Sequence, residues 1–205
     1  MFIKICGVTR LSDALHAAAH GADAIGFVFW PRSPRYIDPA RAAGIIAALP
    51  AGVTAVGVFV NQPVDAVRDV VAKTGITVVQ LHGDEPPDFA GVVGCPVLRA
   101  IRVEQAETAC AAWPGDTMFL VDGSDPVRRG GTGVQADWPR AAAIARTRRV
   151  VLAGGLTAES VAEAIAAVRP FGVDVSSGVE DAPGVKNPDK VARFLANARA
   201  AFQEL

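Results

Sequence analysis

A cysteine and an aspartate each stand at the end of a short apolar run. Cys6 ends the run FIKIC (2–6), and Asp122 ends the run TMFLVD (117–122). A thiolate and a carboxylic acid that face one substrate can exchange protons with it, so this pair indicates general acid–base chemistry. Both residues also have structural interpretations. A cysteine is commonly a small buried hydrophobe, and DGSDP (122–126) is a good turn sequence.

The remaining cysteines and histidines offer less chemistry. Cys95 precedes a proline and Cys110 falls in a helical stretch, so both are interpreted as structural. Three widely spaced cysteines argue against a disulfide framework or a zinc site and favour reduced thiols. His16 and His20 lie one helical turn apart, but no third ligand stands near them, and we expect no metal. His82, in QLHGDE, ends an apolar run; it is expected to line a pocket or to orient a neighbour.

Glycine-rich segments follow three of the later apolar runs. AGGL (153–156) opens a helical stretch, and SSGVE (176–180) follows the last apolar run. Glycines let a backbone approach an anion, and the N–H groups of a helix start donate to it, so we expect a phosphate site. RRGGTG (128–133) is either a lid or a further part of this cradle, and solvated side chains are the alternative for Arg128 and Arg129. The phosphate-site candidates are Gly154, Gly155, Ser176, Ser177 and Gly178.

Two arginines and an aspartate complete the set of candidate binding groups. Arg32 and Arg35 lie in WPRSPRYI (30–37), where a paired N–H fork can recognise a carboxylate. An aromatic-lined loop with an arginine fits an aromatic acid as substrate, although solvated arginines on a surface loop are the alternative. Asp174 can accept a hydrogen bond from a sugar hydroxyl or can fix a loop.

The composition is that of an ordinary globular protein. The chain has 205 residues, of which 51% are hydrophobic and 20% charged, and its formal net charge is -1. This is enough apolar material for a full core. The chain contains no run of like charges and no apolar stretch of membrane-spanning length, so we expect neither a nucleic-acid partner nor a membrane. The amino terminus lacks the features of a signal peptide, and we expect a mature, soluble, cytoplasmic protein.

Apolar runs rich in β-branched residues alternate with alanine-rich stretches of helical periodicity. Eight such pairs without a linker predict a parallel sheet buried on both faces, and we expect one α/β domain over residues 1–205, a (β/α)8 TIM barrel. An open doubly wound sheet would show a Gly-x-Gly-x-x-Gly fingerprint where this chain has CGVTR. The expected strands are residues 2–6, 24–29, 53–60, 77–82, 96–102, 117–122, 149–154 and 172–177, and the expected helices are residues 11–20, 39–49, 63–75, 85–94, 104–113, 138–146, 158–169 and 188–202.

The ends of the expected helices carry suitable capping residues. Asp38, Thr157 and Asn187 each precede a helical stretch and are expected to accept hydrogen bonds from its first N–H groups. Gly21 and Gly75 follow helical stretches, where a left-handed residue commonly ends a helix. These signals support the predicted boundaries.

In a (β/α)8 barrel the carboxyl ends of the strands meet at one mouth, where active sites lie. Cys6 and Asp122 would face each other across this mouth, with His82 at the end of the fourth strand and Asp174 near the end of the eighth. The alternation of side chains along a strand places Lys4 on the same side as Cys6 but deeper, where its charge would lower the pKa of the thiol.

Motifs from the first strand to the last helix are shared with one known family. They are KICG (4–7), GADAIGFVFWPRSPRYI (21–37), VGVFVN (56–61), VQLHGDE (79–85), GGTG (130–133), DW (137–138), GGL (154–156) and RPFGVDVSSGVEDAPGVKN (169–187). Through them the chain resembles the phosphoribosylanthranilate isomerase family of tryptophan biosynthesis. The resemblance implies an Amadori rearrangement of N-(5-phosphoribosyl)anthranilate to 1-(o-carboxyphenylamino)-1-deoxyribulose 5-phosphate, without metal or organic cofactor.

The resemblance also implies roles for individual residues. Asp122 corresponds to the general acid that protonates the ribose ring oxygen, which requires a carboxyl group that holds its proton at neutral pH. Cys6 corresponds to the thiolate that takes the C2 proton, and Arg35 to the arginine that holds the anthranilate carboxylate. Gly155 and the pair Ser177–Gly178 fall in the phosphate-holding loops. The segment DGSDPVRR is the least family-like stretch.

Two other functions remain open on the sequence. A histidine-pathway aminoaldose isomerase performs the same type of reaction, but that family has an aspartate where this chain has Cys6. It also needs a second phosphate site, for which the first half of the chain offers no glycine-rich loop; a dual-substrate barrel is a variant of this alternative. A non-catalytic sugar-phosphate-binding barrel would explain the glycines but not the paired Cys6 and Asp122. Both a monomer and a homodimer are compatible with the sequence.

Overall fold

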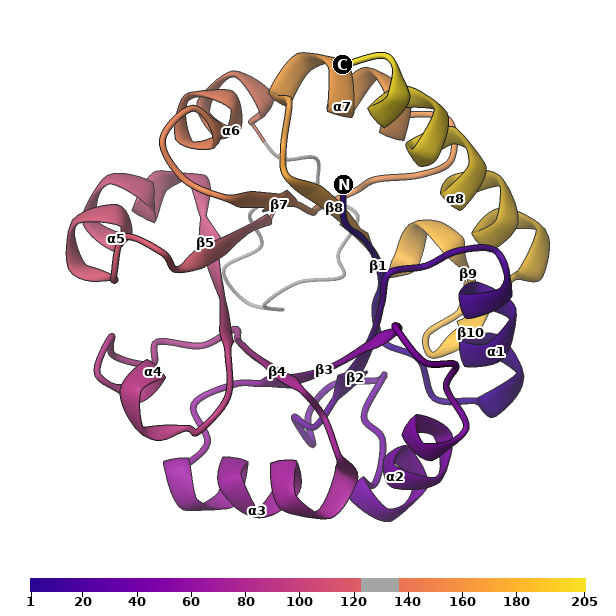
Figure 1. Cartoon of the computed structure of the whole chain (residues 1–205), viewed down its shortest axis with the longest axis vertical. Coiled ribbons are helices and arrows are strands. Elements are labelled where there is room, and N and C mark those ends of the chain that lie inside the picture. The colour runs from indigo at the N-terminus through magenta and orange to yellow at the C-terminus, as the bar shows by residue number, and fades with distance from the viewer. Residues whose placement is uncertain (123–136) are drawn as a thin grey trace.

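The chain folds into a closed barrel of eight parallel strands in sequential order (Figure 1). The structure is a computed structural model that describes residues 1–122 and 137–205. Each strand pairs with its neighbours in the chain, and the first strand closes the barrel against the eighth. The predicted (β/α)8 architecture is therefore confirmed. The strands are β1 (Ile3–Ile5), β2 (Ala24–Val28), β3 (Thr54–Phe59), β4 (Val78–Leu81), β5 (Val97–Arg102), β6 (Met118–Asp122), β7 (Val150–Leu152) and β8 (Gly172–Val175).

Helices surround the barrel and follow the predicted order, with the largest differences in the fourth and fifth units. The predicted helix 85–94 is reduced to a single turn, because prolines 86 and 87 supply no N–H and Gly94 takes a left-handed φ of 83°. The fifth predicted helix begins as a 3₁₀ turn, η1 (Val103–Gln105). The helices are α1 (Leu11–Ala19), α2 (Pro39–Ala47), α3 (Val64–Thr74), α4 (Phe89–Val92), α5 (Ala106–Ala112), α6 (Trp138–Ala145), α7 (Val161–Val168) and α8 (Pro188–Gln203).

Most of the predicted helix caps are present. Asp38 accepts hydrogen bonds from the first N–H groups of α2, and Asn187 does the same for α8. Gly75 ends α3 in the left-handed region, and Gly21 lies just beyond α1 with a φ of 88°. The prediction for Thr157 was wrong in position: α7 begins three residues later than expected, and the Thr157 hydroxyl instead caps the turn that leads into it.

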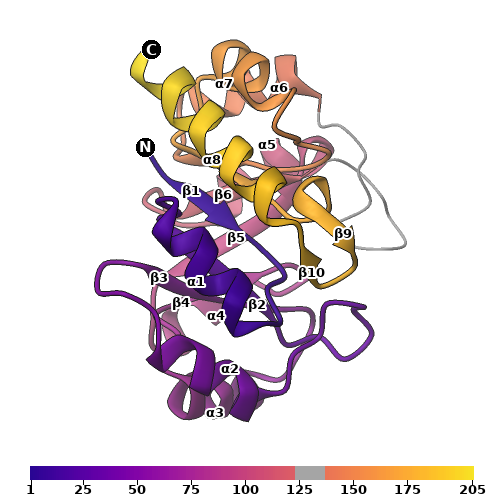
Figure 2. The ribbon, with the colours of Figure 1, turned by 90° about the vertical axis from the view of Figure 1, so that its right-hand side faces the viewer.

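A short hairpin after β8 was not predicted. It follows the 3₁₀ turn η2 (Ser177–Val179) and consists of β9 (Glu180–Ala182) and β10 (Val185–Lys186), which pair antiparallel. Two and three residues are too few to show an alternating pattern, so the sequence signal was only the Pro-Gly turn between them. In Figure 2 this hairpin lies at the end of the barrel opposite the two chain termini.

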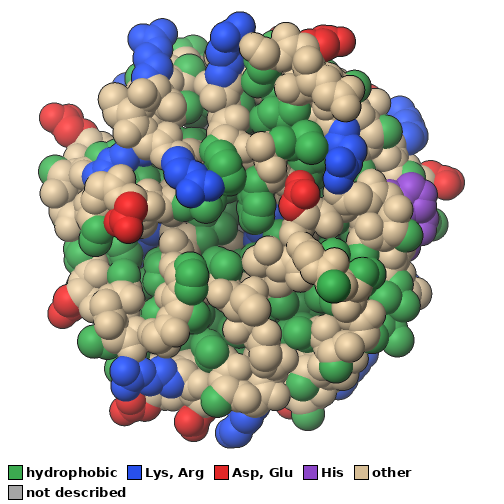
Figure 3. Space-filling view, in the orientation of Figure 1, with side chains coloured by type: hydrophobic (Ala, Val, Ile, Leu, Met, Phe, Trp, Pro, Cys, Tyr) green, Lys and Arg blue, Asp and Glu red, His purple; other side chains and the backbone are tan. Residues whose placement is uncertain are grey.

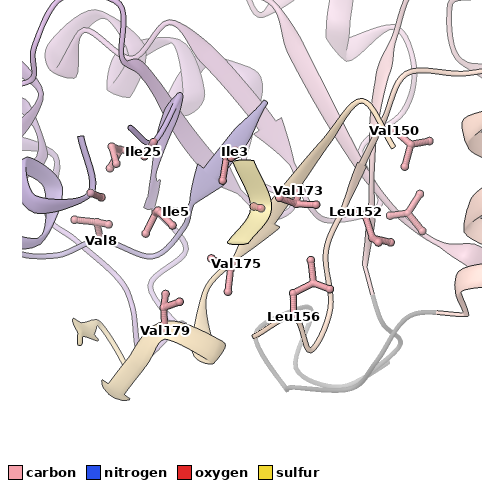
Figure 4. Close-up of a cluster of buried hydrophobic side chains, with 14 of the residues drawn as sticks. Ile3, Ile5, Val8, Ile25, Val150, Leu152, Leu156, Val173, Val175 and Val179 are labelled. Carbon is pink, nitrogen blue, oxygen red and sulfur yellow. The ribbon is translucent and has the colours of Figure 1, made fainter. Parts of the chain in front are cut away.

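The main core lies between the strands and the surrounding helices. Ile3, Ile5, Val173 and Val175 project from the adjacent strands β1 and β8 into this layer and are almost fully buried (Figure 4). Every residue of β1, β2, β7 and β8 is buried, as expected for parallel strands that are covered on both faces. Within the described residues, no helix has the length and apolar character needed to cross a membrane.

The end of the barrel that carries the termini is closed by apolar groups. In the view of Figure 3, hydrophobic side chains gather at the centre of this end and most charged side chains lie toward its rim. A small core cluster that includes Leu98, Leu120 and Val151 fills the barrel interior, with Phe2 and Phe171 packed against it. Access to the polar interior of the barrel is therefore from the opposite end.

We predict that the Asp38→Ala substitution lowers the free energy of unfolding by about 1 kcal/mol, because two N–H groups of α2 lose their acceptor. Denaturant unfolding followed by circular dichroism measures the change. Asp88→Ala is the matched control, since Asp88 also occupies an N-cap position and is exposed but makes no capping hydrogen bond. Equal destabilisation by both substitutions would contradict the capping role.

Candidate active site

A pocket of about 460 Å³ opens at the carboxyl ends of the strands. This volume is typical of sites for small organic ligands. All ten candidate site residues line it, although they come from strand ends far apart in the chain. They are Cys6, Arg35, His82, Asp122, Gly154, Gly155, Asp174, Ser176, Ser177 and Gly178.

Cys6 lies directly after β1 and is 8% exposed, at the wall of the pocket. Its backbone N–H donates to the Val175 carbonyl at 2.8 Å, which extends the pairing of β1 with β8 to the pocket. Burial raises the pKa of the Cys6 thiol, and the positive charges of Lys4 and Lys186 oppose this without reversing it. The prediction that the charge of Lys4 lowers the pKa of the thiol is thus supported for the contribution of Lys4, but the pKa of Cys6 remains higher than that of a free thiol.

Lys4 lies inside the barrel, below Cys6, and is fully buried. Its Nζ donates to Asp174 Oδ1 at 2.9 Å, across the register pair that joins β1 to β8. Burial alone would lower the pKa of Lys4, but the charges of Asp174 and Cys6 outweigh it and raise the pKa to about 12. Lys4 is therefore a permanent cation, and in this structure Asp174 is its counter-ion.

Arg35 is held by a carboxylate that the sequence analysis did not single out. Its Nε donates to both Glu180 oxygens at 3.0 and 3.2 Å, and its Nη2 donates to Oε2 at 2.7 Å. The same carboxylate accepts from Lys186 Nζ at 2.8 Å and from the Gly184 N–H at 3.2 Å. The β9–β10 hairpin thus fixes the arginine on the pocket wall.

The charged partners of Glu180 decide its ionisation. Burial alone would raise the pKa of Glu180, but hydrogen bonds from Arg35 and the charge of Lys186 bring it below its usual value. The hairpin is in turn fastened to α1, because Asp13 accepts from the Lys186 N–H and from Arg10. The contact between the hairpin and α1, which lies outside the pocket, therefore helps to hold Arg35 inside it.

The side chains of His82 and Asp122 lie next to each other at the pocket wall. His82 Nε2 lies 3.5 Å from Asp122 Oδ2, and both side chains are mostly buried, at 15% and 12% exposure. The other ring nitrogen, Nδ1, lies 2.9 Å from the Gln80 carboxamide nitrogen. The imidazole is thus placed between an amide and a carboxyl group.

The glycine-rich loops at strands β7 and β8 lie side by side. Gly154 and Gly155 both have left-handed φ values, 85° and 65°. A Cβ at Gly178 would collide with the carbonyl of Leu156, so the two loops approach closely only because this position is a glycine. Backbone N–H groups of glycine-rich loops suit an anion such as phosphate.

The residues interpreted as structural lie away from this pocket. Cys95 and Cys110 are half-buried free thiols that do not line it. A ring nitrogen of His16 lies 3.0 Å from the Pro188 carbonyl, and one of His20 lies 2.9 Å from the His16 carbonyl. Within residues 1–122 and 137–205, no cluster of three metal-ligating side chains is found. The expectations for residues 128–133, including Arg128 and Arg129, lie outside the described residues.

An apolar patch in the pocket wall also escaped the sequence analysis. Cys6, Val28 and Val58 form one buried cluster, and the Trp30 side chain packs against it. The signal was available in the alternation of β2 and β3, which turns these valines toward the barrel interior. The patch gives the pocket a surface suited to an aromatic ring.

Comparisons with known proteins agree on one family. The family model described as N-(5'phosphoribosyl)anthranilate (PRA) isomerase matches residues 3–197. The chain is 49% identical over 198 residues to the N-(5'-phosphoribosyl)anthranilate isomerase of Citrifermentans bemidjiense, covering 96% of each chain. It is also similar to the crystal structure of phosphoribosyl anthranilate isomerase from Thermotoga maritima, with a TM-score of 0.90, 41% identity and coverage of 98% and 99%.

A further solved structure contains a ligand. It is a phosphoribosyl anthranilate isomerase in complex with reduced 1-(o-carboxyphenylamino)-1-deoxyribulose 5-phosphate. This chain matches it with a TM-score of 0.85 and 40% identity, covering 98% of this chain and 99% of the other. The similarity extends over the whole barrel in every one of these comparisons.

We predict that Lys4→Met raises the pKa of the Cys6 thiol further, because a cation is lost and Asp174 is left as an unpaired negative charge nearby. The rate of Cys6 alkylation, measured against pH in a Cys95→Ser/Cys110→Ser background, should reach half its maximum at a higher pH. Lys73→Met, an exposed lysine in the last turn of α3, is the control. An unchanged or lower midpoint in Lys4→Met would contradict this electrostatic role. Circular dichroism verifies that the variant is folded, since an unpaired buried charge costs roughly 3–5 kcal/mol.

Proposed function

This chain belongs to the N-(5'-phosphoribosyl)anthranilate isomerase family, and we propose that Cys6 and Asp122 are the general base and general acid of its reaction. The enzyme carries out the Amadori rearrangement of N-(5-phosphoribosyl)anthranilate to 1-(o-carboxyphenylamino)-1-deoxyribulose 5-phosphate in tryptophan biosynthesis. The observation that supports the assignment is the single pocket in which a thiol, a carboxyl group, an arginine and two glycine-rich loops converge. Each part of the substrate has a chemically matched group there.

The first step requires an acid. The Asp122 carboxyl group gives its proton to the ribose ring oxygen, the C1–O bond breaks, and the nitrogen lone pair forms a protonated Schiff base at C1. Asp122 is 9% exposed, so little water competes for this proton. His82, 3.5 Å away, is the polar side chain placed to orient the carboxyl group.

The second step requires a base. The Cys6 thiolate removes the proton from C2, and the electrons of the C2–H bond form a C1–C2 double bond that neutralises the iminium nitrogen. The resulting enolamine rearranges to the ketose. The iminium makes C2–H acidic, so a thiolate of moderate basicity suffices. Burial strengthens this base, while Lys4 and Lys186 stabilise its charged form.

The remaining groups bind the two ends of the substrate. Arg35 holds the anthranilate carboxylate: Glu180 occupies its Nε edge and thereby orients the guanidinium, which leaves further N–H donors for the ligand. The aromatic ring packs on the patch formed by Val28, Val58 and Trp30. The phosphate binds the backbone of the loops that contain Gly155 and Gly178, which also line the pocket.

Assembly and compartment are also proposed. The isomerase of Thermotoga maritima is described as dimeric, which supports a homodimer for this chain as one of the two states allowed by its sequence. Three free cysteines support a reducing compartment, and we assign the enzyme to the cytoplasm.

We predict that Cys6→Ala and Asp122→Asn each lower kcat by roughly 100- to 10,000-fold, since each removes one proton-transfer group. Conversion of freshly prepared N-(5-phosphoribosyl)anthranilate to the ketose amine measures this. Cys110→Ala, which alters a thiol outside the pocket, should retain wild-type kcat. A near-normal kcat in either active-site variant would remove that residue from the mechanism.

We predict that Arg35→Lys raises KM about tenfold or more with a smaller effect on kcat, because a lysine cannot keep both the pair with Glu180 and a two-point contact with the carboxylate. Steady-state kinetics separate the two constants. Arg41→Lys is the control, as Arg41 is exposed on α2 and its Nη2 donates to a backbone carbonyl. If kcat instead falls by a larger factor than KM rises, Arg35 acts in the chemical steps and not mainly in binding.

A further inference from the structure

Gln80 is a buried polar side chain to which the mechanism above gives no task. It lies in β4, is 1% exposed, and lines the pocket two residues before His82 on the same side of the strand. Its carboxamide Nε2 lies 2.9 Å from His82 Nδ1. Its Oε1 has no hydrogen-bond partner among the described residues, which is unusual for a buried amide.

The carboxamide and the aspartate contact opposite nitrogens of one imidazole. Asp122 Oδ2 is 3.5 Å from His82 Nε2, so Gln80, His82 and Asp122 form a chain of three side chains. A neutral imidazole carries one proton, and the nitrogen without it is an acceptor. The group that contacts Nδ1 therefore decides which nitrogen carries the proton, and so whether Nε2 donates to Asp122 or accepts from it.

The two orientations of the amide have opposite consequences for the acid. With Nε2 of Gln80 donating to Nδ1, the ring proton lies on His82 Nε2 and favours a carboxylate on Asp122. With the amide rotated by 180°, Oε1 accepts a proton from Nδ1–H, and the lone pair of His82 Nε2 can accept the Asp122 O–H. Only the second arrangement holds a protonated carboxyl group ready to act as an acid.

We propose that Gln80 is a positioning residue that holds His82 in its Nδ1–H tautomer, so that Asp122 keeps its proton in the resting enzyme. The inference rests on the acid role proposed for Asp122. In the rotated amide, Oε1 takes the position 2.9 Å from Nδ1 and accepts from Nδ1–H, while His82 Nε2 accepts from Asp122. The amide suits this position because it is uncharged and can offer an acceptor to Nδ1–H.

Nitrogen-15 NMR of the resting enzyme at neutral pH tests the proposal, since the shifts of Nδ1 and Nε2 report which one carries the proton. The chain has three histidines, and loss of one set of signals in His82→Asn assigns the relevant ring. Wild-type His82 should show the Nδ1–H tautomer. In Gln80→Met, which has neither donor nor acceptor, the Nε2–H form should predominate. An Nε2–H ring in the wild type, or a ring unchanged by Gln80→Met, would overturn the proposal.

Two further variants separate this role from simple packing. Gln62→Met is the matched control, because the hydrogen bonds of the Gln62 carboxamide are with the backbone of residues 29 and 60; its His82 signals should equal those of the wild type. If Gln80→Met does not fold, Gln80→Glu replaces it, since a carboxylate only accepts and should keep Nδ1 protonated. Loss of the Nδ1 proton in Gln80→Glu would contradict the proposal.

Kinetics test whether Gln80 acts through the ring. Gln80→Met should lower kcat about tenfold in the wild-type background, the size expected for one lost hydrogen bond, and by less than twofold in a His82→Asn background. Equal losses in both backgrounds would assign Gln80 a packing role and overturn the inference. Full activity of Asp122→Asn would instead refute the acid assignment, and the tautomer measurement distinguishes that failure from a failure of the Gln80 inference.

Discussion

The ion pair between Lys4 and Asp174 joins the two strands at which the barrel closes. Its members are 170 residues apart in the chain and belong to β1 and β8, which are neighbours only in the closed barrel. Both side chains are buried, and a buried charge without its partner costs several kcal/mol. The pair therefore links barrel closure to the charge state of the pocket, since Cys6 lies immediately above it.

The charges around Cys6 suggest why a buried thiol can act as a base. Lys4, Lys186 and Arg35 contribute three positive charges, and Asp174 and Glu180 contribute two negative ones, which leaves one positive charge in excess. A thiolate balances that excess without bulk water. Burial nevertheless raises the pKa of Cys6, so the thiolate that forms is a stronger base than an exposed one. In this pocket a smaller fraction of Cys6 is ionised, but each thiolate that forms is more basic.

Local signals predicted the regular parts of the barrel well and its irregular parts poorly. Strand positions followed from β-branched apolar runs, because burial on both faces leaves few other sequences possible. Asp38 and Asn187 were recognised because capping is decided within four residues. The β9–β10 hairpin was missed since its strands are too short to show an alternating pattern. The length of α4 was overestimated because two prolines interrupt its first turn.

The sequence by itself determined the fold class, the family and the set of strand-end residues that line the pocket, since periodicity, local motifs and barrel topology suffice for these. Only the tertiary structure decided how those residues are paired. Glu180 holds Arg35, Asp174 holds Lys4, and an imidazole lies between Gln80 and Asp122. These pairs join positions up to 170 residues apart, and their hydrogen bonds and pKa shifts depend on distances of a few ångströms that exist only once the barrel has closed.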